Sequence, residues 1–115
     1  MKDTELVKFE LESGALYAHV VGEIDHHSAL TVRQAIDTKI FTVRPEVLYL
    51  ELSRVGFMDS SGLGLIMGRY SLMKKLGGRT VVLEPSEAIM RIVRLAGLER
   101  TVKIEYAQNT KEGLK

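Results

Sequence analysis

Two short polar segments carry most of the side chains that could perform chemistry. One is Gly-Glu-Ile-Asp-His-His-Ser at 22–28, and the other is Arg-Val-Gly-Phe-Met-Asp-Ser-Ser-Gly at 54–62. Carboxylates, imidazoles and hydroxyls serve in acid–base catalysis, nucleophilic catalysis and phosphate transfer. Each segment also precedes a predicted helix, where the same side chains cap unpaired backbone N–H groups. These side chains can therefore be interpreted either as helix caps or as groups that take part in a reaction.

A serine nucleophile is the first chemical alternative. The nucleophile elbow of hydrolases has glycine two residues before and two residues after the serine. Met58 precedes Ser60 at that distance and Asp59 precedes Ser61, so neither serine fits. His26 or His27 could act as the general base, but no feature of the sequence places either ring within hydrogen-bond distance of a serine. A Ser–His hydrolase is the third hypothesis, and no catalytic residue is assigned.

Cofactor and metal sites find no support in the pattern. The glycine-rich stretch 62–68 misses the GxGxxG spacing by one residue, and no Gly-Lys-Ser/Thr follows any glycine-rich turn. His26 and His27 are adjacent, so their side chains diverge, and His19 lies inside a predicted strand. The chain has no cysteine, which excludes thiolate metal sites. We expect no metal and no cofactor.

The second segment places three polar residues where one cap would suffice. Asp59, Ser60 and Ser61 stand at a helix start, followed by Gly62 and Gly64, which leave its first turn bare. A bare helix N-terminus lets another group approach, and phosphate is the group best stabilised there. Two interpretations remain open: a hydroxyl that is modified, or a small anion or nucleotide bound at the Gly62–Gly64 turn.

Length and composition limit the class of protein. The 115 residues fit a single domain over 1–115, and 45% hydrophobic with 27% charged residues is ordinary for a globular protein. A net charge of +1 and the absence of tryptophan disfavour nucleic-acid binding. No apolar run approaches the ~20 residues of a membrane span, and residues 1–5 lack the apolar stretch of a signal peptide. A cytoplasmic location is expected.

Hydrophobic periodicity predicts an α/β fold in the order β-β-α-β-α-β-α-β. Alternating or continuous apolar residues predict five strands, at 5–11, 16–21, 47–52, 79–84 and 102–104. Apolar residues at helical spacing predict helices over about 29–43, 61–76 and 87–96, with a weak terminal helix at Thr110–Lys115. Strands that alternate with helices imply a mostly parallel sheet, in which only the first strand pairs antiparallel.

Local signals set the expected helix ends. Ser28 and Ser86 are predicted N-caps, and Gly77-Gly78 is a predicted left-handed stop. Arg69 is assigned to the solvated face of its helix. Sites in open α/β sheets form outside the carboxyl ends of the strands, so both polar segments should lie on one rim. Asp25 should approach the second segment if the two preceding strands are neighbours.

At Phe-Met-Asp-Ser-Ser-Gly-Leu-Gly over 57–64, Gly-Arg-Tyr over 68–70 and Gly77-Gly78, the chain resembles a STAS domain. With the segment 22–27, it resembles the STAS-domain anti-sigma factor antagonists of sporulation. The similarity runs over nearly the whole chain. It departs at Thr110–Lys115, which is short and contains Gly113 where the family has a terminal helix.

The resemblance implies a switch that acts by binding and is not an enzyme. In that family the serine directly after the motif aspartate, here Ser60, is phosphorylated by an anti-sigma factor that is also a serine protein kinase and uses ATP. The unphosphorylated antagonist binds that factor and releases the sigma factor, and a serine phosphatase resets the phosphorylated form. Neither nucleic acid nor membrane is contacted. The resemblance carries over these residues as partner-binding: Glu23, Asp25, Asp59, Ser60, Ser61, Gly62 and Leu63.

Overall fold

The computed structural model describes residues 5–106, which form the predicted order of elements. The strands are β1 (Val7–Glu12), β2 (Ala15–Ile24), β3 (Val47–Met58), β4 (Arg79–Leu83) and β5 (Lys103–Glu105). The helices are α1 (His26–Val43), α2 (Ser60–Lys75) and α3 (Glu87–Leu95), and a 3-10 turn, η1 (Leu98–Arg100), that was not predicted precedes β5. The expected helix at Thr110–Lys115 lies outside the described residues.

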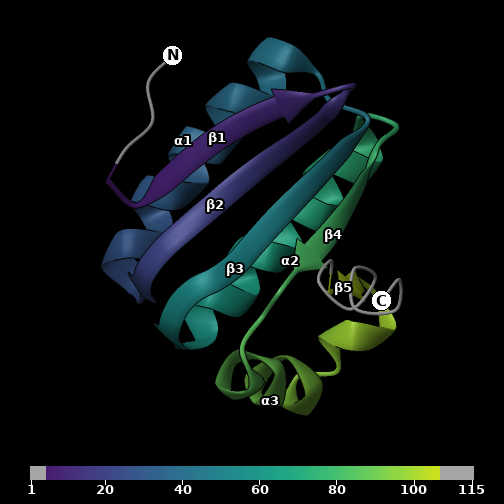
Figure 1. Ribbon diagram of the computed structural model, residues 1–115. Helices are drawn as coiled ribbons and strands as arrows, with labels where there is room; N and C mark the ends of the chain where they lie inside the picture. The colour runs from purple at the N-terminus through teal and green to yellow at the C-terminus, as the bar shows by residue number, and fades with distance from the viewer. Residues whose placement is uncertain (1–4, 107–115) are drawn as a thin grey trace, which may run out of the picture.

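The five strands form one mixed sheet in the order β1-β2-β3-β4-β5. β1 pairs with β2 antiparallel, and every other pair is parallel, which confirms the predicted topology. α1 and α2 pack side by side on one face of the sheet (Figure 1). α3 lies beyond the end of β4 and packs against β3 (Figure 1). Among residues 5–106, no helix is long and apolar enough to cross a bilayer.

The core lies between the sheet and the α1–α2 pair. Buried apolar residues alternate along β2 at 16, 18 and 20 and along the first half of β3 at 48, 50 and 52, so the pleat turns one face of each strand toward the helices. The buried core side chains of these strands and of α1 include Leu16, Ala18, Val20, Leu48, Leu50, Ile36 and Ile40. This packing fixes where each helix begins relative to the strand before it.

β3 is longer than the sequence pattern predicted. The prediction ended it at Leu52 because Ser53 and Arg54 are polar, but the strand continues to Met58. Its second half pairs with β2 after a bulge, which shifts the register between the pairs His19↔Glu51 and Val21↔Arg54. Backbone pairing with a ten-residue neighbour therefore sustains the strand where its own side chains do not. The predicted loop 54–62 shrinks to Asp59 alone, between β3 and α2.

Arg69 is buried and does not lie on a solvated helix face. Its side chain enters the α1–α2 contact, where Arg69 Nε lies 2.8 Å from Asp37 Oδ1 of α1. Burial raises the pKa of the Asp37 carboxyl, although Arg69 and Arg33 oppose that rise. Removing one partner of a buried ion pair leaves an uncompensated charge. This pair therefore joins α1 to α2 within their contact.

The sheet face opposite α1 and α2 carries a polar bridge across three strands. His19 of β2 places Nδ1 2.8 Å from Glu51 Oε1 of β3 and Nε2 2.6 Å from Glu10 Oε1 of β1. Burial alone would lower the pKa of His19, but the bonds to Glu51 and Glu10 outweigh it and raise that pKa. Because both ring nitrogens face carboxylate oxygens, the imidazolium is the form that satisfies both bonds.

This bridge makes the stability of the sheet depend on pH. A folded-state pKa above the unfolded value gives stability that is complete below the unfolded pKa, about 6.5, and is lost as the pH rises through the folded pKa. We expect wild type to be more stable than His19→Gln by on the order of 1 kcal/mol near pH 6, and that difference to shrink toward pH 9. Urea unfolding at a series of pH values measures it. A difference that stays constant over this range would contradict the assignment.

Candidate functional site

The two polar segments meet at one rim because the strands before them are neighbours. β2 and β3 run parallel, with Ile24 paired to Met58 at their ends. The backbone N–H of Asp59 donates to the Ile24 carbonyl at 3.1 Å, which ties the first residue after β3 to the last residue of β2. α1 and α2 therefore begin beside each other. This places Asp25 and Asp59 on the same edge of the sheet, as the sequence predicted.

Asp25, and not Ser28, is the N-cap of α1. Asp25 Oδ1 accepts from the backbone N–H groups of His27 and Ser28, each at 2.9 Å, and Ser28 Oγ accepts from the Asp25 N–H at 2.9 Å. These reciprocal bonds form a capping box, in which Ser28 occupies the third helical position. The bond from the Ser28 N–H, followed by that from His27, lowers the pKa of Asp25 against the opposing effect of burial.

Asp59 caps α2 and thereby leaves the two serines free of that task. Its Oδ1 accepts from the backbone N–H of Ser61 at 2.8 Å. Ser60 is the first residue of the helix and is exposed. Its hydroxyl has no hydrogen-bond partner among the described residues, whereas the Ser28 hydroxyl donates to the Glu23 carbonyl at 2.8 Å. An unengaged hydroxyl thus stands at a helix N-terminus, next to a carboxylate.

Gly62 has a packing role in the first turn of α2. It is buried, and a Cβ built on it would overlap the side chain of Met58 at the end of β3. Gly64 differs, because a Cβ there meets no atom within 4 Å. The sequence interpretation of a bare turn that awaits a ligand therefore fails at Gly62, where Met58 fills the space. Gly62 is therefore buried and is not part of the accessible site.

The other predicted residues divide between the rim and the core. Glu23, at the end of β2, is exposed, and Leu63 is half-buried against the core. We call Glu23, Asp25, Asp59, Ser60 and Ser61 the serine rim. The side chains of His26 and His27 do not diverge as predicted, because their ring centroids lie 4.0 Å apart with the ring planes tilted by 37°. Within residues 5–106 no histidine is hydrogen-bonded to either serine, and no group of three His, Cys, Asp or Glu residues could hold a metal ion.

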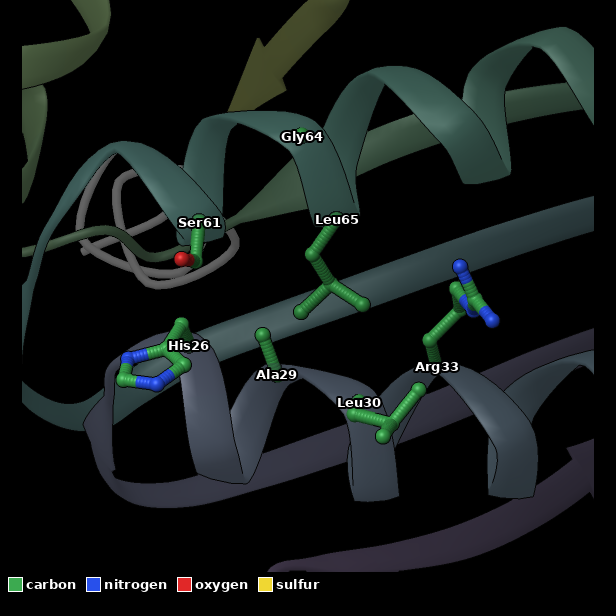
Figure 2. A pocket seen from close by; sticks show the side chains of 7 residues that line it. All are labelled: His26, Ala29, Leu30, Arg33, Ser61, Gly64 and Leu65. Carbon is green, nitrogen blue, oxygen red and sulfur yellow. The ribbon is translucent and has the colours of Figure 1, made fainter.

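A groove of about 390 Å³ runs from the serine rim between α1 and α2. Figure 2 shows Ser61 and Leu65 of α2 facing α1 across it. Its lining residues are His26, Ala29, Leu30, Arg33, Ser61, Gly64 and Leu65. Sequence analysis did not single out Leu30 or Arg33. Their positions in the sequence could have indicated a surface beside the rim, because both residues lie outside the apolar stripe of α1 and within one or two turns of its start.

The two glycines of α2 give a matched pair for testing this geometry. Gly62→Ala should lower the free energy of unfolding by ~1–3 kcal/mol, because Met58 must leave its place in the core. Gly64→Ala should raise it by up to ~1 kcal/mol, because alanine favours helix and the space is open. Urea unfolding with circular dichroism measures both. Equal effects of the two substitutions would contradict the packing described for Met58.

Comparison with known proteins places the chain in a family. The model of the STAS domain matches residues 7–111. The anti-sigma F factor antagonist of Paenibacillus polymyxa is 36% identical over 98 residues, which are 85% of this chain and 84% of that protein. The anti-sigma-B factor antagonist of Bacillus subtilis is 30% identical over 77% of this chain and 80% of its own length.

The fold agrees with that of a solved relative, the anti-sigma factor antagonist SpoIIAA. Its unphosphorylated form is 28% identical and covers 94% of this chain and 95% of its own, with a TM-score of 0.76. The phosphorylated form of the Bacillus protein is 27% identical and covers 95% and 99%, with a TM-score of 0.69. By sequence and by fold, the chain belongs to the STAS domain family and, within it, to the anti-sigma factor antagonists.

Proposed function

We propose that this protein binds an anti-sigma factor that is also a serine kinase, and that phosphorylation of Ser60 switches this binding off. The unmodified protein releases the sigma factor, which the resemblance of the two polar segments assigns to sporulation. A serine phosphatase returns the phosphorylated form to the binding state. The protein acts in the cytoplasm, where sigma factors meet RNA polymerase, and it catalyses no reaction itself.

The state of the Ser60 hydroxyl carries this proposal. Of the two serines after Asp59, Ser60 is the exposed one, and Ser61 is half-buried and lines the groove. The cap of α2 is supplied by Asp59, so the Ser60 hydroxyl can be modified without the loss of a structural bond. The related protein SpoIIAA has both an unphosphorylated and a phosphorylated form. This supports the proposal that the present protein is phosphorylated as well.

Electrostatics explains how one phosphate would prevent docking. Phosphoserine adds about −1.5 to −2 charges next to Asp59, on a rim that also carries Asp25 and Glu23. At ~6 Å, two like charges repel by about 0.7 kcal/mol in water and about 2.8 kcal/mol at an effective dielectric of ~20. A dianion that faces an acidic group of the partner doubles this, which corresponds to roughly 10- to 10⁴-fold in affinity. The fold need not change.

The alternatives have less support. An anion or nucleotide at the Gly62–Gly64 turn would need a bare cradle, and Met58 occupies the space beside Gly62. A hydrolase would need the imidazole of His26 or His27 bonded to a serine, and neither ring has such a bond among residues 5–106. No observation favours either function over a switchable binding module.

The proposal predicts distinct behaviour for two variants of Ser60. Ser60→Ala should bind the anti-sigma factor as wild type does and accept no phosphate from it with ATP. Ser60→Glu should bind roughly 3- to 100-fold more weakly, because it carries one unit of negative charge, which is part of the phosphate charge. Titration calorimetry gives the affinities, and mass spectrometry locates the phosphate.

Ser61→Ala is the matched control for the modified position. It should still take up one phosphate per molecule, located at Ser60. If Ser60→Ala is phosphorylated like wild type and Ser61→Ala is not, the modified residue is Ser61 and the assignment to Ser60 is wrong.

A further inference from the structure

The α1–α2 groove combines apolar walls with unpaired positive charge. Leu30 and Leu65 supply apolar surface, and Leu30 is 49% exposed. Arg33 lies on the groove and is exposed, with no ion-pair partner among residues 5–106. No acidic residue lines the groove. The nearby carboxylate of Asp37 is already paired with the buried Arg69. Arg33 also acts electrostatically on that carboxylate, which it shares with Arg69, and no carboxylate of the groove lining neutralises Arg33.

We propose that this groove binds an apolar segment of the anti-sigma factor that carries an acidic side chain opposite Arg33. The inference rests on the proposed function for the identity of the partner, and it adds a second contact surface with a stated chemistry. The serine rim would meet one part of the partner and the groove another. Ser61 belongs to both, so the two surfaces are continuous.

The distribution of charge supports this occupant. The rim carries the carboxylates of Glu23, Asp25 and Asp59, whereas the groove carries the guanidinium of Arg33. A partner with one uniform sign of charge would be repelled by one of the two surfaces. An acidic side chain of the bound segment is attracted by Arg33 over the groove and repelled by the carboxylates of the rim, so the segment fits in only one orientation. The apolar part of its segment covers Leu30, which is otherwise left half in water.

Size also suits a short segment of chain. A space of about 390 Å³ accommodates a few side chains, at the low end of the range for ligand pockets. Figure 2 shows Leu65 directed toward Ala29 and Leu30, with Arg33 farther along α1 from the rim. An apolar side chain can therefore enter between the leucines while a carboxylate one turn away reaches Arg33.

A charge reversal tests the acidic contact. Arg33→Glu is compared with Arg91→Glu, an exposed residue of α3, because both change the net charge equally. One charge pair at ~4 Å is worth about 5-fold in affinity in water, so a reversal should weaken binding roughly 10- to 30-fold. We expect this loss for Arg33→Glu only, and it should shrink at high salt. Equal affinities of the two variants would overturn the inference.

A second pair tests the apolar contact. Leu30→Ala should weaken binding at least fivefold. Leu95→Ala, which changes a leucine of α3 that is 83% exposed, should leave the affinity unchanged. Each variant is first shown by urea unfolding to be as stable as wild type. Unchanged affinity of Leu30→Ala would refute the apolar contact.

The affinities of Ser60→Glu and of wild type, measured in the same series, separate the two proposals. If Ser60→Glu binds weakly while Arg33→Glu and Leu30→Ala bind like wild type, the groove inference fails and the switch remains. If wild type does not bind the anti-sigma factor, both fail.

Discussion

The hydrogen bond from the Asp59 N–H to the Ile24 carbonyl joins the carboxyl ends of β2 and β3, and the rest of the site depends on it. Parallel pairing brings two strand ends to one edge, and each strand is followed at once by a helix. Two helix N-termini therefore stand side by side. Their unpaired N–H groups require caps, and aspartates at 25 and 59 supply them. The negative charge of the rim follows from this structural need.

Because these aspartates accept hydrogen bonds from the unpaired N–H groups of the two helices, the hydroxyl of Ser60 is not needed as a cap. Behind it, the contact between α1 and α2 includes the ion pair of Arg69 and Asp37. Met58 fills the space beside Gly62 and fixes α2 on the end of β3. On this account, a charge added at Ser60 would act by repulsion and would need no conformational change.

The order of elements, the single antiparallel strand and the meeting of the two polar segments were predictable, because they follow from hydrophobic period and from the rules for parallel sheets. The end of β3 could not be predicted, because the second half of this strand carries polar residues such as Ser53 and is held by pairing with β2. The cap of α1 was misassigned, because Asp25 and Ser28 are both good caps and only the reciprocal bonds separate them. Arg69 was misassigned because its partner Asp37 lies on another helix.

The most direct test of the account is the affinity of the wild-type protein for its anti-sigma factor before and after stoichiometric phosphorylation at Ser60, measured at low and at high salt. We predict a loss of at least tenfold on phosphorylation, smaller at high salt, together with an unchanged circular dichroism spectrum. Equal affinities of the two forms, or a loss accompanied by unfolding of α2, would contradict a switch that works by electrostatic repulsion at the rim.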